Sequence, residues 1–274
     1  GLGDVYKRQL SDQAWDERII AVHAANRGVY GVRKVWKALL RAYPGEHIAR
    51  CTVERRMNAL GLAGVPNTRT PKTTRRPTQA VEFPDDQLER DFSAPAPDTR
   101  WVADITYVST WSGFVYVAFV TDLFSRRIVG WRVANHLRAD LALDALEQAI
   151  WSRRQQGQET LTGLVHHSDH GVQYVAIAYT DRLAEAGIEA SVGSVGDSFD
   201  NAAAEAVNRL YKKELIWREG PWSGMEAVEA ATLSWVDWYN TSRLHGHCAH
   251  TPPAEYEAAY YASLNRAPET ASTA

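Results

Sequence analysis

Cysteine is scarce in this chain of 274 residues, which contains Cys51 and Cys248 in separate regions and no others. Two distant thiols do not suggest a disulfide framework, and they fit a reducing compartment. No apolar run approaches the length of a membrane-spanning helix, and no signal peptide is recognisable. We therefore expect a cytoplasmic protein, whose 45% hydrophobic composition can bury a core divided into two or three units.

An overall excess of positive charge is also absent, because the formal net charge is -3. The charge is unevenly distributed, however. From Arg18 to Thr78 thirteen basic residues are opposed only by Glu46 and Glu54, a local charge of +11. A segment with this charge attracts a phosphate backbone, so the N-terminal quarter predicts contact with nucleic acid.

Apolar residues recur at helical spacing over 12–25 and 31–42, and residues 52–60 predict a third helix capped by Thr52 and stopped by Gly61. Three short helices with tight connections over residues 12–65 resemble a helix-turn-helix domain, whose last helix would offer Arg55, Arg56 and Asn58 to DNA. A small helical bundle with a solvated basic face is the alternative. Residues 66–98, rich in Pro, Thr and charge, are expected to be a linker.

The remaining chain predicts an α/β core over residues 99–220. We expect strands at 100–109, 114–122, 126–133, 163–167 and 188–192, with helices at 139–155 and 175–186 and a further helix carrying Glu205. This order fits a mixed sheet flanked by helices. Residues 222–239 suggest a closing helix within a C-terminal helical extension and tail, 221–274.

Three carboxylates in this core favour metal chemistry. Asp104 lies in an apolar strand, Asp169 follows a short strand where a loop begins, and Glu205 lies early in a helix that Asp200 can cap. Taken singly, Asp104 could be a hydrogen-bonded structural residue, Asp169 a turn-forming residue and Glu205 a residue on a solvent-exposed helix face. Together they suit two Mg2+ ions about 4 Å apart, which prefer oxygen ligands and promote in-line displacement at phosphorus. On the same helix, Asn208, Arg209 and Lys212 follow Glu205 at helical spacing and suit phosphate.

Four segments carry a resemblance to a known family: residues 101–107, 167–174, 196–202 with Glu205, and 238–256. With thirty-five residues between Asp169 and Glu205, the chain resembles the OrfB transposases of two-frame bacterial insertion sequences. These belong to the IS-three family within the DDE transposase and retroviral integrase superfamily. The resemblance covers nearly the whole chain. It implies an RNase H-like integrase catalytic core in which Asp104, Asp169 and Glu205 bind two Mg2+ ions, which Mn2+ can replace.

The same resemblance implies end cleavage and strand transfer on DNA, namely the element's terminal repeats and a target. It further implies a homo-oligomer on DNA, an OrfA protein or fused upstream segment as partner, and a place at the bacterial nucleoid. Supporting residues at or near the family motifs are His167, Gln173, Tyr174, Asn201, Arg243 and His245. Ala206 and Val207 depart from the Ser and aromatic residues that often follow the catalytic Glu.

Two further features are interpreted conservatively. His245, His247, Cys248 and His250 lack the two separated ligand pairs of a structural zinc site, so zinc is not expected there. The chain begins at Gly1, and residues 4–9 match what one frame of a transposon-end adapter for sequencing libraries would encode. We expect residues 1–11 to be a non-native or disordered leader, with the natural protein beginning upstream, as a frameshift fusion or otherwise.

Two other functions stay open at this point. A catalytically silent DNA-binding remnant would use residues 12–65 to occupy or repress an element's ends. An RNase H-like nuclease would cleave without joining strands. The three carboxylates argue against the remnant, and the basic N-terminal region and Tyr239-Asn240 argue against a plain nuclease.

Overall fold

The computed structural model describes residues 2–66, 94–158, 160–168, 173–174, 176–192 and 202–265. For residues 2–11, 192 and 202 it describes the backbone alone. The chain divides into two compact units. The first, called the helical unit below, comprises Gly1–Lys72 and Ser242–His250. The second, the core unit, comprises Thr73–Thr241 and Thr251–Ala274.

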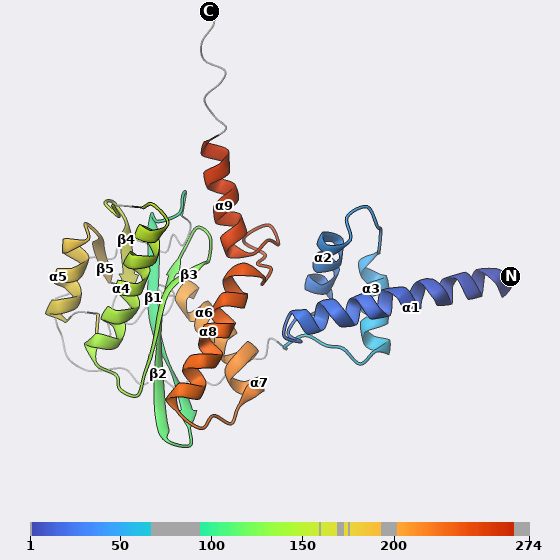
Figure 1. Ribbon diagram of the computed structural model, residues 1–274, viewed down its shortest axis with the longest axis horizontal. Coiled ribbons are helices and arrows are strands. Elements are labelled where there is room, and N and C mark those ends of the chain that lie inside the picture. The colour runs from blue at the N-terminus through green and yellow to red at the C-terminus, as the bar shows by residue number, and fades with distance from the viewer. Residues whose placement is uncertain are drawn as a thin grey trace, which may run out of the picture. The chain divides into compact units, whose positions relative to one another are not determined.

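The helical unit contains α1 (Leu2–Ala25), α2 (Val32–Ala42) and α3 (Arg50–Ala59), which are shown in blue in Figure 1. Each of the shorter helices buries two apolar residues four positions apart, Val35 and Leu39 in α2 and Val53 and Met57 in α3. This spacing puts the pair on one helix face, and burial of that face holds the helices together.

Two sequence expectations for this unit differ from the structure. Helix α1 begins at Leu2 rather than at residue 12, so most of the segment expected to be a leader continues the helix. The N-cap of α3 is Ala49, whose side chain makes no capping hydrogen bond, and Thr52 lies inside the first turn. The predicted stop at Gly61 is confirmed, because its φ of 66° suits glycine.

A segment from the far end of the sequence completes the helical unit. This return segment, residues 242–250, packs against Tyr30, which is fully buried and whose hydroxyl accepts a hydrogen bond from the Leu244 N–H at 2.6 Å. Leu244 and Cys248 are buried as well. The sequence assigned these residues to a C-terminal extension of the core, because no local pattern shows with which unit a loop packs.

The core unit is a five-stranded sheet of the described residues, in the order β3-β2-β1-β4-β5. Strand β2 (Gly113–Asp122) runs antiparallel to both of its neighbours, β1 (Arg100–Thr110) and β3 (Ile128–Ala134). Strands β4 (Val165–Ser168) and β5 (Glu189–Val192) run parallel to β1. The mixed sheet predicted from the sequence is therefore present, with strand limits within two residues of those expected.

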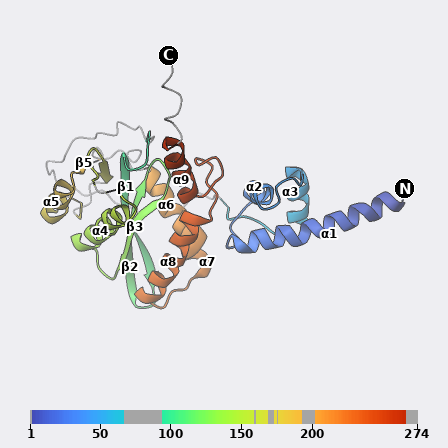
Figure 2. The same cartoon turned by 45° about the horizontal axis from the view of Figure 1, so that its top comes forward.

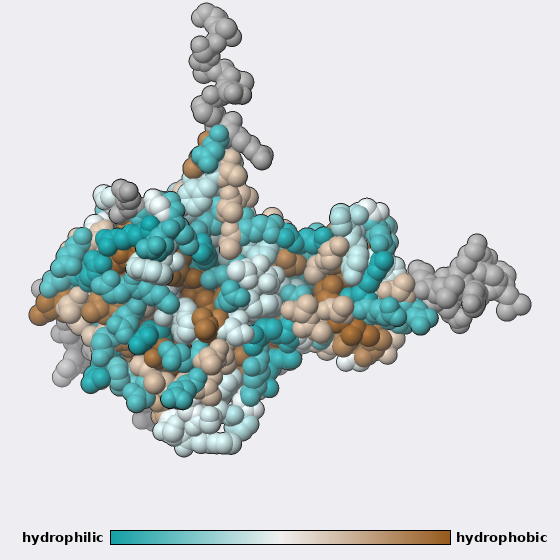
Figure 3. All heavy atoms as spheres, in the orientation of Figure 1, coloured by the Kyte–Doolittle hydropathy of each residue, from teal (hydrophilic) through white to brown (hydrophobic). Residues whose placement is uncertain are grey.

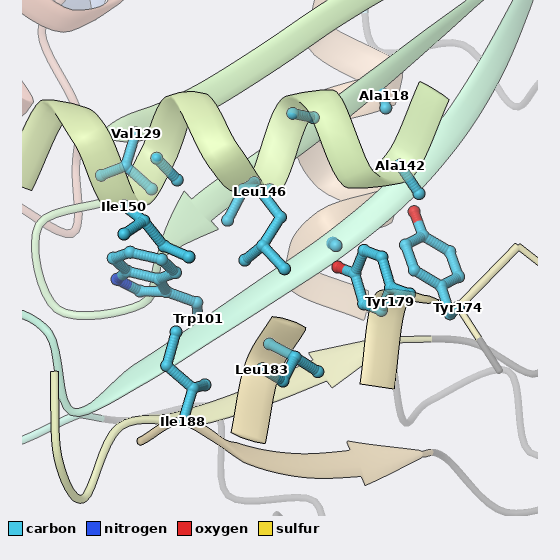
Figure 4. Packing of buried hydrophobic residues seen from close by; sticks show 14 of the residues in the cluster. Trp101, Ala118, Val129, Ala142, Leu146, Ile150, Tyr174, Tyr179, Leu183 and Ile188 are labelled. Carbon is cyan, nitrogen blue, oxygen red and sulfur yellow. The ribbon is translucent and has the colours of Figure 1, made fainter. Parts of the chain in front are cut away.

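Helices cover both faces of the sheet. Helices α4 (Ala139–Gln155) and α5 (Ile177–Glu185) lie on one side, and α6 (Ala202–Tyr211) and α8 (Met225–Thr241) lie on the other (Figures 1 and 2). Figure 4 shows the first face, where Trp101 and Val129 of the sheet meet Leu146 and Ile150 of α4. On the second face Phe119 meets Tyr211 and Trp235, at ring-centroid distances of 5.1 and 6.1 Å. Because successive side chains of a strand point to opposite faces of the sheet, each face has its own layer of buried apolar residues.

Three elements after α6 were not expected. A π-helical turn, Lys212–Ile216, continues α6 directly, and α7 (Trp217–Glu219) and α9 (Pro253–Leu264) follow in the chain. The closing helix predicted at 222–239 is α8, which starts at Met225. Its Asn240 side-chain amide exchanges two hydrogen bonds of 2.9 Å with the backbone of Ile128, so it satisfies the outer edge of β3.

No helix of the described residues is long and apolar enough to cross a membrane. In the view of Figure 3 hydrophilic residues cover much of the surface, and apolar residues form separate small patches.

A buried ionic cluster fastens α9 to the core unit. Arg153 is 1% exposed and pairs with Glu257 of α9, to which its NH2 group donates at 3.0 Å, and with Asp98 at 2.7 Å. The Ser125 hydroxyl oxygen lies 2.8 Å from Asp122 and 3.0 Å from Glu257, so its one proton is shared between the two carboxylates. Burial raises the pKa of Asp98 to about 6, whereas the hydrogen bonds and charge of Arg153 outweigh burial and lower the pKa of Glu257.

Glu257→Gln is expected to destabilise the core unit by about 3 kcal/mol, because it leaves the buried Arg153 with only part of its compensating charge. Urea unfolding measures the change. Glu226→Gln, at an exposed position of α8, is the matched control, with an expected change within about 0.5 kcal/mol. Equal effects of the two variants would show that the cluster does not anchor α9.

Candidate active site

The site is built around Asp104 in the middle of β1, the central strand of the sheet. Its Oδ2 accepts a hydrogen bond of 2.8 Å from the Nδ2 of Asn208, and its Oδ1 accepts one of 2.8 Å from the Ile105 N–H. The carboxylate is half-buried. It is therefore oriented by donors on the sheet and on α6, which lowers the cost of keeping a charge at this depth.

Helix α6 brings Asn208 to Asp104 and places Glu205 one turn earlier. Ala204 and Val207 are buried on the sheet side of α6, and Ala204 packs with Val102 and Leu123. Glu205, three positions before Asn208, is exposed. Residues three apart share a helix face, so the carboxylate of Glu205 belongs to the side of α6 that also carries Asn208.

The third predicted carboxylate, Asp169, lies outside the described residues. Strand β4 ends at Ser168, the residue before it. The parallel pairing of β1 and β4 joins Ala103 to Ser168, and these two residues precede Asp104 and Asp169 in the sequence. Of the predicted metal-binding carboxylates, the structure thus describes Asp104 and Glu205, together with Asn208 beside Asp104.

Lys212 lies where α6 passes into the π-helical turn. Its Nζ is 4.4 Å from the ring centroid of Tyr107. Burial lowers the pKa of Lys212, and the nearby Tyr107 and Asp104 oppose that shift. The charge of Asp104 and the face of the Tyr107 ring thus offset only part of the cost of burying the ammonium. Arg209, the other predicted phosphate ligand, is exposed.

The donor set suits a hard divalent cation. Asp104 and Glu205 supply carboxylate oxygens, and the buried Oδ1 of Asn208 accepts no hydrogen bond from the described residues. Oxygen donors with residual acceptor capacity are what Mg2+ prefers. Within the described part of the chain, which omits Asp169, no group of three His, Cys, Asp or Glu residues gathers closely enough to hold a metal by itself.

The two histidines before Asp169 are embedded in the sheet. His166 is 1% exposed, and its Nε2 shares a hydrogen bond of 3.1 Å with the Tyr179 hydroxyl. His167 is fully buried, and its Nδ1 lies 3.0 Å from the Ser191 hydroxyl on β5. Burial lowers the pKa of His166 to about 4. His166 is therefore neutral at physiological pH and serves the packing of the core.

Gln173 and Tyr174, predicted to support the site, are also buried. Gln173 donates from Nε2 to the Leu137 carbonyl at 3.4 Å, and the Tyr174 ring packs edge-on against Tyr179 at 5.5 Å. Both line a cleft of about 170 Å³ beside β1. The other lining residues are Ile105, Thr106, Tyr107, Tyr116 and Leu137.

The residues predicted to read DNA on α3 are partly engaged in ion pairs. Arg56 pairs with Asp16 of α1, with Nε to Oδ1 at 2.7 Å, and with Asp12 at 3.4 Å. Arg55 pairs with Asp12 at 3.1 Å. Asn58 is exposed. The two acids precede the segment over which the positive charge was counted, so the count missed them.

The remaining supporting residues fall elsewhere. Asn201 lies outside the described residues. Arg243 and His245 are buried in the return segment of the helical unit, with the Arg243 NH1 group 3.3 Å from the His245 Nε2. The contact between Asn208 and Asp104 was not predicted, although an Asn one turn after the helix Glu is a pattern that could have suggested it.

Comparisons with known proteins agree on both units. Residues 94–198 match the family model described as an integrase core domain, residues 186–253 match a second model with that description, and residues 10–70 match an HTH-like domain. With these matches, the predicted fold class is confirmed: an α/β integrase core of mixed sheet and flanking helices, preceded by an all-helical HTH-like domain.

Several curated proteins are similar over nearly the whole chain. A protein of Mycobacterium tuberculosis named as a transposase for insertion sequence element IS986/IS6110 is 54% identical, over 95% of this chain and 92% of its own length. The transposase for IS629 of Shigella sonnei is 52% identical, over 94% and 83%. Among solved structures, the HTLV-2 integrase catalytic core domain in complex with magnesium has a TM-score of 0.44 and 14% identity, covering 60% of this chain and 99% of that one.

The low pKa of His166 predicts a pH dependence of stability. The ordinary value of 6.5 applies to the unfolded chain, so between pH 6.5 and about 4 only the unfolded state takes up this proton. Stability should fall by up to about 3 kcal/mol as the pH drops through that window. His166→Asn should remove this component, whereas the exposed His47→Asn should not. An NMR titration of His166 with a midpoint near 6.5 would refute the assignment.

Proposed function

The chain belongs to the integrase-core transposases of bacterial insertion sequences, and we propose that Asp104, Asp169 and Glu205 are the metal-binding residues of its DDE-type site. The observation that carries the proposal is the hydrogen bond from Asn208 to Asp104. It joins the central strand to the helix that carries Glu205, which supports one site for these two carboxylates. The pairing of Ala103 with Ser168 supports Asp169 as the third.

The donor set supports Mg2+ as the cofactor, with Mn2+ able to replace it. When bound, two Mg2+ ions would activate the attacking oxygen and stabilise the leaving oxygen during in-line displacement at phosphorus. Asp104, Asp169 and Glu205 would hold them, and Asn208 would keep the Asp104 carboxylate in its ligating orientation. The ammonium of Lys212, close to Asp104 and partly desolvated, is placed to stabilise a DNA phosphate next to the metal-binding carboxylates.

The reaction in this proposal has two steps at the ends of the element. A water oxygen forms a bond to phosphorus while the bond to the leaving oxygen breaks, which frees a 3′-hydroxyl. The oxygen of that hydroxyl then forms a bond to a target phosphorus while the bond from this phosphorus to the target's own 3′-oxygen breaks, so the end is joined to the target and a target 3′-hydroxyl is released. The carboxylates bind metal and do not attack phosphorus, so no covalent protein–DNA intermediate forms.

DNA is the partner that the helical unit binds in this proposal, supported by its match to an HTH-like domain. Arg55, Arg56 and Asn58 on α3, together with Arg209 on α6, are proposed DNA contacts. For Arg55 and Arg56 this requires exchange of Asp12 and Asp16 for phosphate. We further propose that the protein acts as a homo-oligomer on DNA, with an OrfA protein or fused upstream segment.

Asp104→Asn, Asp169→Asn and Glu205→Gln should each lower cleavage of DNA that carries the element's terminal repeats by more than about 100-fold. Each substitution removes the charge of a metal ligand and leaves the side-chain size nearly unchanged. Removing a residue that only hydrogen-bonds to a metal ligand typically costs about 10- to 100-fold in activity, so removing the ligand itself should cost more. Denaturing gels with Mg2+ measure cleavage, and joined products measure strand transfer. Wild-type binding without any cleavage would indicate a silent remnant, and cleavage without joining a plain nuclease. Full cutting by one variant would remove that residue from the mechanism.

Asn208→Leu should weaken Mn2+ binding by about 10- to 100-fold, because Asp104 loses the donor that orients it. Calorimetric titration of Mn2+ into the full chain measures this without DNA. The exposed Glu226→Gln, which also changes one polar side chain on this face of the fold, is the control. Equal Mn2+ affinity for Asn208→Leu and wild type would show that this hydrogen bond does not prepare the site.

A further inference from the structure

Three aromatic side chains form a partly exposed patch on the hairpin of β1 and β2. Tyr107 is 42% exposed and Phe114 is 56% exposed, and their rings meet edge to face at a centroid distance of 5.5 Å. In the register of the two strands Tyr107 lies opposite the half-buried Tyr116, and Ser109 lies opposite Phe114. Tyr107, Phe114 and Tyr116 therefore share one face of the hairpin. Single exposed apolar side chains are ordinary, whereas a contiguous group of them marks an interaction surface.

This group of rings lies past the point where the parallel strand β4 ends. Strand β4 pairs with β1 as far as Ala103, so Asp104 and Tyr107 lie beyond its carboxyl end, and Figure 1 shows the hairpin extending past it. Ligands of open α/β sheets bind in the crevice outside the carboxyl ends of the strands. Tyr107 follows Asp104 by three residues, a distance of about 10 Å along a strand, which is the axial rise of about three nucleotides of B-DNA. A DNA strand with a phosphate at Asp104 therefore has its next nucleotides within reach of the Tyr107 ring.

The Tyr107 ring also lines the cleft of about 170 Å³ beside β1. Tyr116 and Leu137 add apolar wall to this cleft, and Gln173 adds a polar group. The Gln173 side chain is 8% exposed and is oriented by the hydrogen bond from its Nε2 to the Leu137 carbonyl. Drug-sized ligands use pockets of about 300–1,000 Å³, so this cleft suits a single flat ring system. A nucleobase is recognised by aromatic or apolar walls on its faces and by a polar group at its edge, and the cleft offers both.

A cation lies against the same ring. The ammonium of Lys212 is 4.4 Å from the Tyr107 ring centroid, and it is near enough to Asp104 to feel the charge of that carboxylate. A nucleotide supplies a flat ring for Tyr107 and an anionic phosphate for Lys212, the combination that single-stranded nucleic acid offers to aromatic and basic side chains. A second copy of the chain fits less well, because a two-fold axis would bring the Lys212 ammonium groups of both copies to one interface.

We propose that the surface around the Tyr107 ring binds one nucleobase of the DNA strand that enters the metal site. This surface, called the stacking patch below, consists of Tyr107, Phe114, Tyr116 and Lys212. The base leaves the duplex and lies against the Tyr107 ring with its edge toward Gln173, while Lys212 binds a phosphate of the same strand. Stacking on the ring offsets the cost of taking the base out of the duplex. This role rests on the proposed DNA cleavage and adds to it a contact with a base.

Tyr107→Leu in the full chain tests the stacking patch by binding of terminal-repeat DNA, measured by fluorescence anisotropy. Ca2+ replaces Mg2+, because its larger and more flexible coordination shell suits in-line displacement poorly. The variant should bind about 5- to 150-fold more weakly, the range for loss of one stacked base. Tyr107→Phe, which keeps the ring, should bind like the wild type. Trp111→Leu removes a 77% exposed ring from the same hairpin, outside the cleft, and is the matched control.

Equal affinity of Tyr107→Leu and wild type overturns the stacking patch, as does an equal loss for Trp111→Leu or for Tyr107→Phe. If Tyr107→Leu leaves DNA binding unchanged and instead lowers the mass of the free protein in sedimentation, the patch joins copies of the chain and the stacking role is wrong.

Changes in the DNA locate the base and need no further variant. Nucleotides near the end of the terminal repeat are replaced one at a time by an abasic site. At one position this should remove the difference between Tyr107→Leu and wild type, because no base is left to stack. For the wild type a mismatch at that position should raise affinity, since an unpaired base costs less to extrude. The same loss for Tyr107→Leu on every abasic DNA would show that Tyr107 does not contact a base.

Failure of the stacking patch is distinguishable from failure of the proposed function. Stacking is measured by binding alone, in Ca2+. Absence of cleavage by the wild type with Mg2+ refutes the proposed function, whereas cleavage by a wild type whose affinity does not depend on Tyr107 refutes only the stacking patch.

Discussion

The hydrogen bond between Asp104 and Asn208 is the constraint on which the site depends. It crosses from the central strand to α6 at 2.8 Å, a distance at which a shift of the helix by one ångström would break it. Since Glu205 lies one turn before Asn208, the bond also fixes which side of α6 carries that carboxylate. Packing of Ala204 against Val102 and Leu123 holds the helix at the required depth. The half-buried carboxylate of Asp104 thus has a side-chain donor on the neighbouring helix, which lowers the cost of its burial.

Two polar side chains, Asn240 of α8 and Glu257 of α9, hold these helices against the rest of the core unit. Asn240 satisfies the outer edge of β3 just before the chain leaves α8, and Glu257 enters the buried cluster around Arg153 just after the chain enters α9. The return segment therefore follows a helix that the part-buried Asn240 ties to the sheet and precedes a helix that the buried Glu257 ties to the core. The segment itself packs within the helical unit, on Tyr30.

Much of the core could be predicted because its signals are local. Runs of β-branched, aromatic and apolar residues predicted strands at 100–109 and 114–122, each one residue shorter than β1 and β2, and the helix predicted at 139–155 is α4. What could not be predicted depended on distant partners. Arg55 and Arg56 looked available for DNA because Asp12 and Asp16, on another helix, were not counted. Asn208 looked like a phosphate ligand because nothing local to α6 shows that Asp104 of the sheet is its neighbour.

The central claim is that Asp104, Glu205 and Asp169 converge on one metal site prepared by Asn208. A crystal structure of the full chain with Mn2+, using anomalous scattering to locate the ions, tests it most directly. We predict Mn2+ within about 2.0–2.2 Å of oxygens of Asp104 and of at least one of the other two carboxylates, the range expected for small divalent ions bound by oxygen. Anomalous peaks only at other residues, with Asp104 still bound to Asn208 and free of metal, would contradict the account.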